Sequence, residues 1–215
     1  MTEALAQRTV GGLHEALLPR LAGVRKDAAI LDLGCGTGAW LARLAAAGYT
    51  NLLGVDQAPL AGGRFVRANL EEPGAALATL HGTCDLVTAI EVIEHVANQG
   101  RFWDAVVGLL KPGGCALITT PNVHSLPARL RWLLSGRVRQ FDEHGDPTHV
   151  APVFLPLLPR LLEPRGLTLG EAWTYPPRGY LAMRPTLRVV FRALAFADPR
   201  PGDTLCFWVH RQGER

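Results

Sequence analysis

The 215-residue chain lacks the features of a membrane or secreted protein. No apolar run reaches the ~18 residues that a helix needs to span a bilayer. Residues 1–20 contain two acids and no uninterrupted apolar core, so we predict no signal peptide. The four cysteines lie far apart without a CxxC pair, which disfavours a disulfide framework or a zinc site. These absences predict free thiols and a cytoplasmic location.

Lysine is also scarce, because arginine supplies 20 of the 22 basic residues. The net charge of +3 is too small to predict nucleic-acid binding by itself. Residues 1–123 carry 9 basic and 11 acidic residues, whereas residues 124–215 carry 13 and 8. We therefore expect the substrate side in the basic half, although an ordinary solvated surface explains the same charge.

What the chain does contain is a regular alternation of strand-like and helix-like segments. The predicted strands are residues 28–33, 51–56, 64–69, 85–90, 115–120, 167–173 and 204–211. The predicted helices are residues 40–47, 75–80, 102–110, 126–134, 154–162 and 184–196. This order predicts an α/β fold with a doubly wound, mostly parallel sheet of seven strands.

We predict a single domain with three functional parts. Residues 1–27 form an N-terminal helical cap, and residues 28–122 form a cofactor-binding half. Residues 123–215 form a substrate and lid half. The arginine-bearing helices 126–134 and 184–196 resemble a lid, although ordinary surface helices with apolar residues facing the sheet fit the same pattern. Ligands in such sheets bind at the carboxyl ends of the strands, where the strand order reverses.

The most informative local stretch is a glycine-rich turn between the first strand and the first helix. Gly34, Gly36 and Gly38 alternate with other residues, and glycine allows positive φ or close approach of a ligand. The free amides at the helix start favour a nucleotide-like or carboxylate-bearing ligand. Asp56 follows Gly34 by 22 residues, as in a dinucleotide fingerprint, so a nicotinamide or flavin oxidoreductase also fits this stretch.

Over residues 28–122 the chain closely resembles the class I S-adenosylmethionine-dependent methyltransferases. The matching segments are Leu31-Asp32-Leu33-Gly34-Cys35-Gly36-Thr37-Gly38, Gly54-Val55-Asp56, and residues 65–70, 84–96 and 110–114. The segments occur in the family's order and spacing. The resemblance implies a Rossmann-like fold, S-adenosyl-L-methionine as cofactor and methyl transfer as the reaction.

The resemblance also implies cofactor contacts at the matching positions. The glycines admit the methionyl part, Asp32 lies beneath it, and the Ile90 carbonyl accepts from its ammonium group. Asp56 accepts from the ribose hydroxyls, and Asn69 replaces the family's usual aspartate at the adenine edge, where its amide oxygen can still accept. The predicted cofactor-binding residues are Asp32, Gly34, Cys35, Gly36, Gly38, Asp56, Gln57, Asn69, Leu70 and Ile90.

The segment Glu91-x-x-Glu94-His95 resembles one found in ubiquinone-pathway O-methyltransferases and small-RNA 2′-O-methyltransferases. In those groups two glutamates, this histidine and a later histidine can hold a divalent metal beside the acceptor oxygen, and His149 is the natural later histidine. Many relatives carry the segment without a demonstrated metal, so a metal is not favoured here. We predict Glu91, His95 and His149 as catalytic residues, with either histidine as a metal-free general base. His144 remains an alternative to His149.

We expect an oxygen on a small molecule, or on a lipid or glycan precursor, to be the methyl acceptor. Nitrogen and carbon acceptors stay open. The competing functions are an NAD(P)-dependent oxidoreductase, a metal-dependent RNA 2′-O-methyltransferase and a cofactor-binding module without catalysis. We expect no stable nucleic-acid partner and no transmembrane segment, while peripheral membrane contact and oligomeric state stay open.

Overall fold

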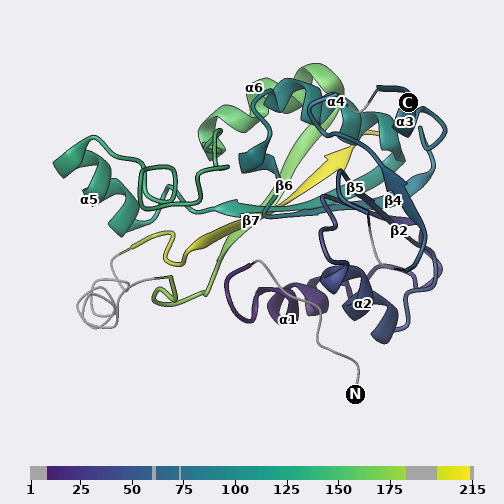
Figure 1. Ribbon diagram of the computed structural model, residues 1–215, viewed down its shortest axis with the longest axis horizontal. Helices are drawn as coiled ribbons and strands as arrows, with labels where there is room; N and C mark the ends of the chain where they lie inside the picture. Colours follow the sequence, from purple (N-terminus) through teal and green to yellow (C-terminus); the bar gives the residue numbers. More distant parts are fainter. Residues whose placement is uncertain (1–8, 60–61, 73, 183–197, 214–215) are drawn as a thin grey trace.

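A computed structural model describes residues 9–59, 62–72, 74–182 and 198–213 of the chain. A seven-stranded sheet runs through the molecule in the order β3-β2-β1-β4-β5-β7-β6, with helices on both faces (Figure 1). Strands β1 to β5 pair in parallel, and β7 runs antiparallel to its neighbours β5 and β6. The predicted fold class, a mostly parallel seven-stranded sheet, is confirmed.

The first half of the chain supplies the parallel part of the sheet. Its elements are β1 (Ile30–Leu33), α2 (Ala39–Ala46), β2 (Leu52–Asp56), β3 (Phe65–Arg67), α3 (Gly74–Ala78), β4 (Cys84–Ile90), η2 (Ile93–His95), α4 (Gln99–Leu109) and β5 (Leu110–Pro121). Strand β4 is buried along nearly its whole length. Both faces of its sheet are covered, which explains its almost continuous apolar sequence.

One predicted boundary in this half is wrong. The sequence predicts a turn at residues 111–114 and a strand from Cys115, but β5 already begins at Leu110. Leu110 pairs with Cys84, and the ladder resumes with Cys115 opposite Leu86, so the residues between them form an irregularity. An ion pair of 2.8 Å between Lys111 and Asp85 closes it. The turn-forming glycines therefore make a bulge within the strand instead of preceding it.

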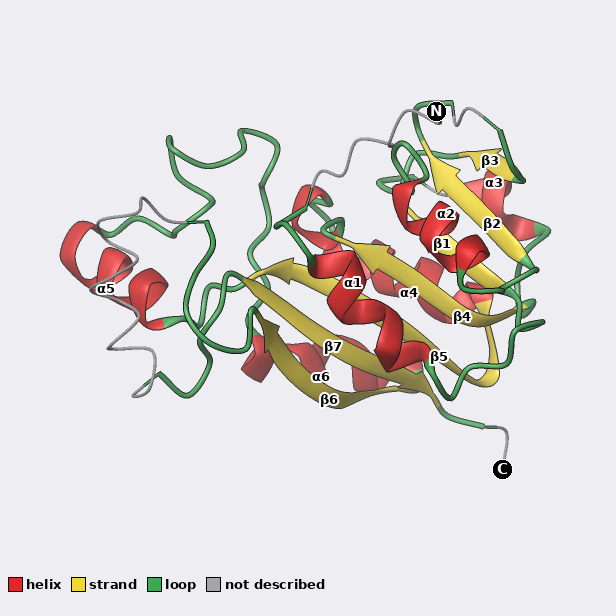
Figure 2. Ribbon diagram, turned by 90° about the horizontal axis from the view of Figure 1, so that it is seen from below, coloured by secondary structure: helices red, strands yellow, loops and turns green. Residues whose placement is uncertain are grey.

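The N-terminal cap covers the same sheet face as α2 (Figure 2). Its described part consists of α1 (Leu13–Leu17) and η1 (Leu18–Leu21), whose leucines pack with Trp40 and Leu44 in one apolar cluster. The helix changes to 3-10 geometry at Leu18, directly before Pro19, which has no amide hydrogen to donate. Helices α3, α4 and α6 cover the opposite face.

The second half completes the sheet and adds a projecting helix. Its elements are α5 (Leu126–Ser135), η3 (Leu155–Leu157), α6 (Leu158–Leu162), η4 (Glu163–Arg165), β6 (Leu167–Tyr175) and β7 (Thr204–Arg211). Helix α5 projects beyond the end of the sheet (Figure 1). The predicted helix 184–196 lies outside the described residues. Within the described ranges, no helix has both the length and the apolar character needed to cross a membrane. All four cysteines are free thiols.

Candidate active site

The carboxyl ends of β1 and β4 open into a cavity of about 510 Å³. These two strands are neighbours at the point where the strand order reverses, which is where doubly wound sheets bind ligands. The cavity wall includes nine of the ten predicted cofactor-binding residues and all three predicted catalytic residues. The exception is Gly38, which lies at the start of α2 with φ +79°.

The glycine turn forms one wall of this cavity from its backbone. Gly34 and Gly36 have φ of +68° and +51°, where other residues are strained. A Cβ atom on Gly34 would lie 2.6 Å from the side chain of Val92, so there is no room for one. A Cβ atom on Gly36 would meet nothing within 4 Å, because this glycine is exposed at the cavity. A side chain at position 36 would therefore occupy ligand space.

Asp56 connects the end of β2 to the glycine turn. Its Oδ2 accepts from the Gly36 amide at 2.8 Å, and its Oδ1 accepts from the Ala58 amide at 3.0 Å. Each carboxylate oxygen has a second lone pair, so both can still accept from the hydroxyls of a ligand. The same carboxylate thus fixes the turn and presents acceptors to the cavity.

Asp32, in β1, is a buried acid at the floor of the cavity, with 3% of its surface exposed. It accepts a hydrogen bond of 2.6 Å from the Thr88 hydroxyl. Burial raises the pKa of Asp32 to about 7; the Thr88 hydrogen bond partly offsets this shift, and the nearby Asp56 adds to it. A cationic ligand group beside Asp32 would favour its ionised form.

Asn69 differs in one detail from what the resemblance implies. Its Oδ1 already accepts from Gln57 Nε2 at 3.1 Å and from the Glu71 amide at 3.0 Å. Both lone pairs of this oxygen are therefore in use. Acceptance from an adenine amino group, as expected from the sequence, requires the Gln57 side chain to turn away first.

The cap contributes wall residues that sequence reasoning missed. Val10 and His14 of the cap line the cavity beside Trp40 of α2, and the His14 and Trp40 rings are 5.2 Å apart. Burial lowers the pKa of His14 to about 4; Arg43 adds to this shift and Glu15 opposes it. His14 is therefore neutral at pH 7. The available signal was a histidine among the apolar positions of a helix predicted to pack beside the site.

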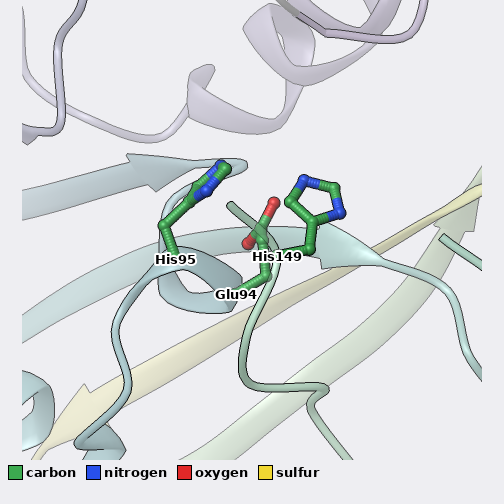
Figure 3. Close-up of side chains that lie close together, drawn as sticks. All are labelled: Glu94, His95 and His149. Atoms are coloured by element: carbon green, nitrogen blue, oxygen red, sulfur yellow. The ribbon is translucent and has the colours of Figure 1, made fainter. Parts of the chain in front are cut away.

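His95 and His149 line the other end of the cavity, and the buried side chain of Glu94 converges with them (Figure 3). Each offers a ligand atom within 4.8 Å of those of the other two. Glu94 and His95 lie in η2 directly after β4, whereas His149 comes from the loop that follows α5. The amide of Val150 donates to the Glu94 carbonyl at 2.9 Å, which holds this loop against η2. His144 is exposed and outside the cavity wall, so the structure selects His149 between the two.

Glu94 has the environment of a ligand-binding carboxylate. Its side chain is 0% exposed, and neither carboxylate oxygen has a hydrogen-bond partner among the described residues. Burial raises the pKa of Glu94 well above its ordinary value, and the charge of Glu91 adds to this. Unpaired buried carboxylates need a compensating partner. A carboxylate with two imidazoles fits a divalent cation.

Glu91 lies in the cavity wall but outside this cluster. Its φ of +56° is unusual for a residue other than glycine, and such strain is common at functional sites. Its amide donates to Thr119 Oγ1 at 3.0 Å, and that hydroxyl donates to Glu91 Oε1, also at 3.0 Å. Burial raises the pKa of Glu91 to about 7; the Thr119 hydroxyl opposes this shift and Asp203 adds to it. Of the two glutamates of the motif, Glu91 is thus bonded to Thr119, whereas Glu94 lies with the two histidines.

A family comparison identifies this arrangement. Residues 5–172 match the family model described as "Methyltransferase domain", which is most of the chain. The chain belongs to this methyltransferase family. Because the glycine turn alone also fits a dinucleotide fingerprint, this match is what decides between the methyltransferase and oxidoreductase interpretations of that turn.

Curated relatives of this methyltransferase domain are ubiquinone biosynthesis O-methyltransferases. The protein from Nitrobacter winogradskyi is 30% identical over 154 residues, covering 62% of this chain and 56% of that protein. The protein from Azorhizobium caulinodans is 34% identical over 109 residues, covering 45% and 42%. The chain thus spans about half the length of the curated relatives it matches.

Solved structures show the same fold at low sequence identity. An S-adenosylmethionine-dependent methyltransferase from Archaeoglobus fulgidus has a TM-score of 0.62 and 18% identity, covering 94% of both chains. Phosphoethanolamine N-methyltransferase 2 of Haemonchus contortus, solved with S-adenosyl-L-methionine, has a TM-score of 0.64 and 16% identity, covering 94% of this chain and 52% of that one. The methyltransferase fold is therefore common to all three.

Proposed function

We propose that this chain is an S-adenosylmethionine-dependent methyltransferase that methylates an oxygen of a small molecule or of a lipid or glycan precursor. One observation carries the proposal: a single cavity is lined both by the glycine turn after β1 and by His95 and His149, which converge with the buried Glu94. The family match supports methyl transfer, and the likeness to ubiquinone biosynthesis O-methyltransferases supports an oxygen acceptor.

The turn and the strand ends fit the cofactor. S-adenosylmethionine, when bound, supplies a methyl group that its sulfonium charge has already activated. The exposed backbone at Gly36 lets its methionyl part approach closely, and Asp56 accepts from the ribose hydroxyls. Asp32 becomes ionised and stabilises the cofactor's ammonium group, while Asn69 and Gln57 lie at the adenine edge.

An acceptor would bind toward the end of the cavity lined by His95 and His149. With the cofactor bound, the acceptor oxygen would form a bond to the methyl carbon as the carbon–sulfur bond breaks and its electron pair passes to sulfur. The chain contributes alignment of these atoms, exclusion of water and a group that takes the hydroxyl proton. Residues 28–122 hold the cofactor, and His149 from the second half of the chain closes the acceptor side.

We further propose that Glu94, His95 and His149 hold a divalent cation, although the sequence alone does not favour one. The buried, unpartnered carboxylate of Glu94 is the observation in favour. A cation at this position would lower the pKa of an acceptor hydroxyl. Glu91, with a pKa of about 7, then takes the proton. Without a cation, His95 or His149 takes it.

The test is calorimetry with S-adenosylmethionine and NADH, followed by methyl transfer from labelled cofactor into fractionated metabolites, with and without chelator. We expect the sulfonium cofactor to bind, NADH not to bind, and label to enter an organic fraction. Binding of NADH alone would overturn the proposal. Cofactor binding without transfer to any fraction would indicate a binding module. Label in RNA, with affinity that falls steeply with salt, would favour the ribose methyltransferase.

A further inference from the structure

The loop between α5 and η3 holds both histidines of the site by the same ring atom. His149 Nδ1 lies 2.9 Å from the carbonyl oxygen of Gln140, and His95 Nδ1 lies 3.2 Å from that of Thr148. A carbonyl can only accept a hydrogen bond. Each Nδ1 must therefore carry a proton. In the neutral ring this leaves a lone pair on Nε2, the atom available for a ligand or a transferred proton.

His95 has a second contact that points to the same tautomer. The Thr148 hydroxyl lies 2.9 Å from His95 Nδ1 and donates to Asp146 Oδ1 at 2.5 Å. Asp146 also accepts from the Thr148 amide at 2.8 Å. These two hydrogen bonds hold the pKa of Asp146 below its ordinary value, so the carboxylate is an acceptor. The single hydroxyl proton of Thr148 is thus directed to Asp146, and its lone pair faces His95.

We propose that Thr148 and Asp146 are positioning residues that hold His95 in its Nδ1-protonated tautomer, with the Nε2 lone pair presented to the acceptor. The inference rests on the proposed function, but it is the same whether Nε2 binds a cation or takes a proton. Both uses need an unprotonated Nε2, and the Nε2-protonated tautomer provides neither. His95 remains exposed at the cavity. Thr148 and Asp146 therefore fix the Nδ1 edge of the ring and leave the Nε2 edge open.

The shape of the loop supports this assignment. Gln140, whose carbonyl accepts from His149, has φ +70°. A Cβ atom on Gly145 would lie 2.3 Å from that same carbonyl oxygen. The amides of Val150 and Ala151 both donate to the Glu94 carbonyl. The loop is therefore folded so that two of its carbonyl oxygens meet the two histidines while two of its later amides are bonded to the Glu94 carbonyl.

The assignment is tested with Thr148→Val, which keeps the side-chain shape and removes the hydroxyl, and with Asp146→Asn. Thr148→Ser restores the hydroxyl, and Glu143→Gln is a control that removes a charge from the same loop at an exposed ion pair with Arg137. Histidine ring ¹⁵N shifts of the ligand-free protein at ~pH 8, above the usual histidine pKa, report which nitrogen carries the proton. Calorimetry with Zn²⁺ or Mn²⁺ alone reports the cation affinity.

We expect the Nδ1-protonated tautomer of His95 in the wild type, Thr148→Ser and Glu143→Gln. Thr148→Val and Asp146→Asn keep the 3.2 Å contact of Nδ1 with the Thr148 carbonyl and lose or redirect only the 2.9 Å contact with the hydroxyl. The Nε2-protonated form should therefore become visible beside the Nδ1-protonated form, and cation affinity should fall on the order of 10-fold. If Thr148→Val and Asp146→Asn both keep the ring shifts and the cation affinity of the wild type, Thr148 and Asp146 do not position His95. Calorimetry with S-adenosylmethionine on the same samples separates the two proposals. If the wild type does not bind this cofactor, the proposed function is wrong. The ring shifts still decide the tautomer of His95 in that case.

Discussion

The two ends of the cavity are built in different ways. At the cofactor end, the backbone of residues 34–36 and the carboxylate of Asp56 form the wall, and main-chain hydrogen bonds hold them. At the acceptor end, the side chains of Glu94, His95 and His149 meet from segments far apart in the sequence. The cofactor end therefore depends on the backbone conformation of a few residues, whereas the acceptor end depends on individual side chains. Variants at the acceptor end should therefore lower turnover, whereas variants at the cofactor end should lower the affinity for S-adenosylmethionine.

The largest effect is expected at the acceptor end. Replacement His149→Ala should lower kcat by about 10²- to 10⁴-fold, because it removes a cation ligand or a proton acceptor from the acceptor end. Affinity for S-adenosylmethionine should stay within a few-fold of wild type in calorimetry. His144→Ala is the matched control and should retain activity. Equal loss of cofactor affinity and turnover in His149→Ala would contradict the separation of the two ends.

The reverse pattern is expected for Gly36→Val at the cofactor end. Position 36 has a positive φ, which is strained for valine, and the new side chain fills space that the ligand requires. The Kd for S-adenosylmethionine should therefore rise by about 10-fold or more. Rates extrapolated to saturating cofactor should change much less. The control is Gly23→Ala, where a Cβ atom meets nothing within 4 Å and which lies outside the cavity. Unchanged cofactor affinity in Gly36→Val would place the ligand elsewhere.

Asp32 provides a pH-dependent test of the same end. Its pKa is raised from 3.8 to about 7, so the folded state holds a proton that the unfolded state releases. Stability of the ligand-free chain should therefore fall as pH rises from about 4 to about 7, on the order of 1.4 kcal/mol per pKa unit. Asp32→Asn should flatten this slope in urea denaturation, whereas the exposed Asp27→Asn should not. Cofactor affinity of the wild type should rise over the same interval.

The smallest effect is expected for Asn69→Asp, which introduces the residue that the resemblance leads one to expect. Gln57 and the Glu71 amide can still donate to a carboxylate at this position. We expect the Kd for S-adenosylmethionine to change by less than about 3-fold, under 1 kcal/mol. Asp56→Asn serves for comparison and should weaken binding more, since it changes the group that accepts from the Gly36 amide and that we propose accepts from the ribose. A larger effect at position 69 than at 56 would reverse our ranking of these contacts.

Much of the fold and of the cofactor end could be predicted from the sequence. The apolar run of β4, the glycine turn and the acid that ends β2 are local signals, because each depends on residues adjacent in the chain. Their order implied a parallel sheet and therefore a shared edge for the strand ends. Nine of the ten expected cofactor-binding residues line one cavity for this reason.

Tertiary structure alone decided the details that depend on packing between distant segments. Residues 111–114 form a bulge because β5 pairs with β4 on both sides of them. His149, not His144, reaches the site because the amide of Val150 bonds the Glu94 carbonyl. Glu94 joins the histidines while Glu91 bonds Thr119, although both glutamates belong to one short motif. Local sequence specifies which residue types are present, but the register of the sheet and the path of the loop determine which of them meet.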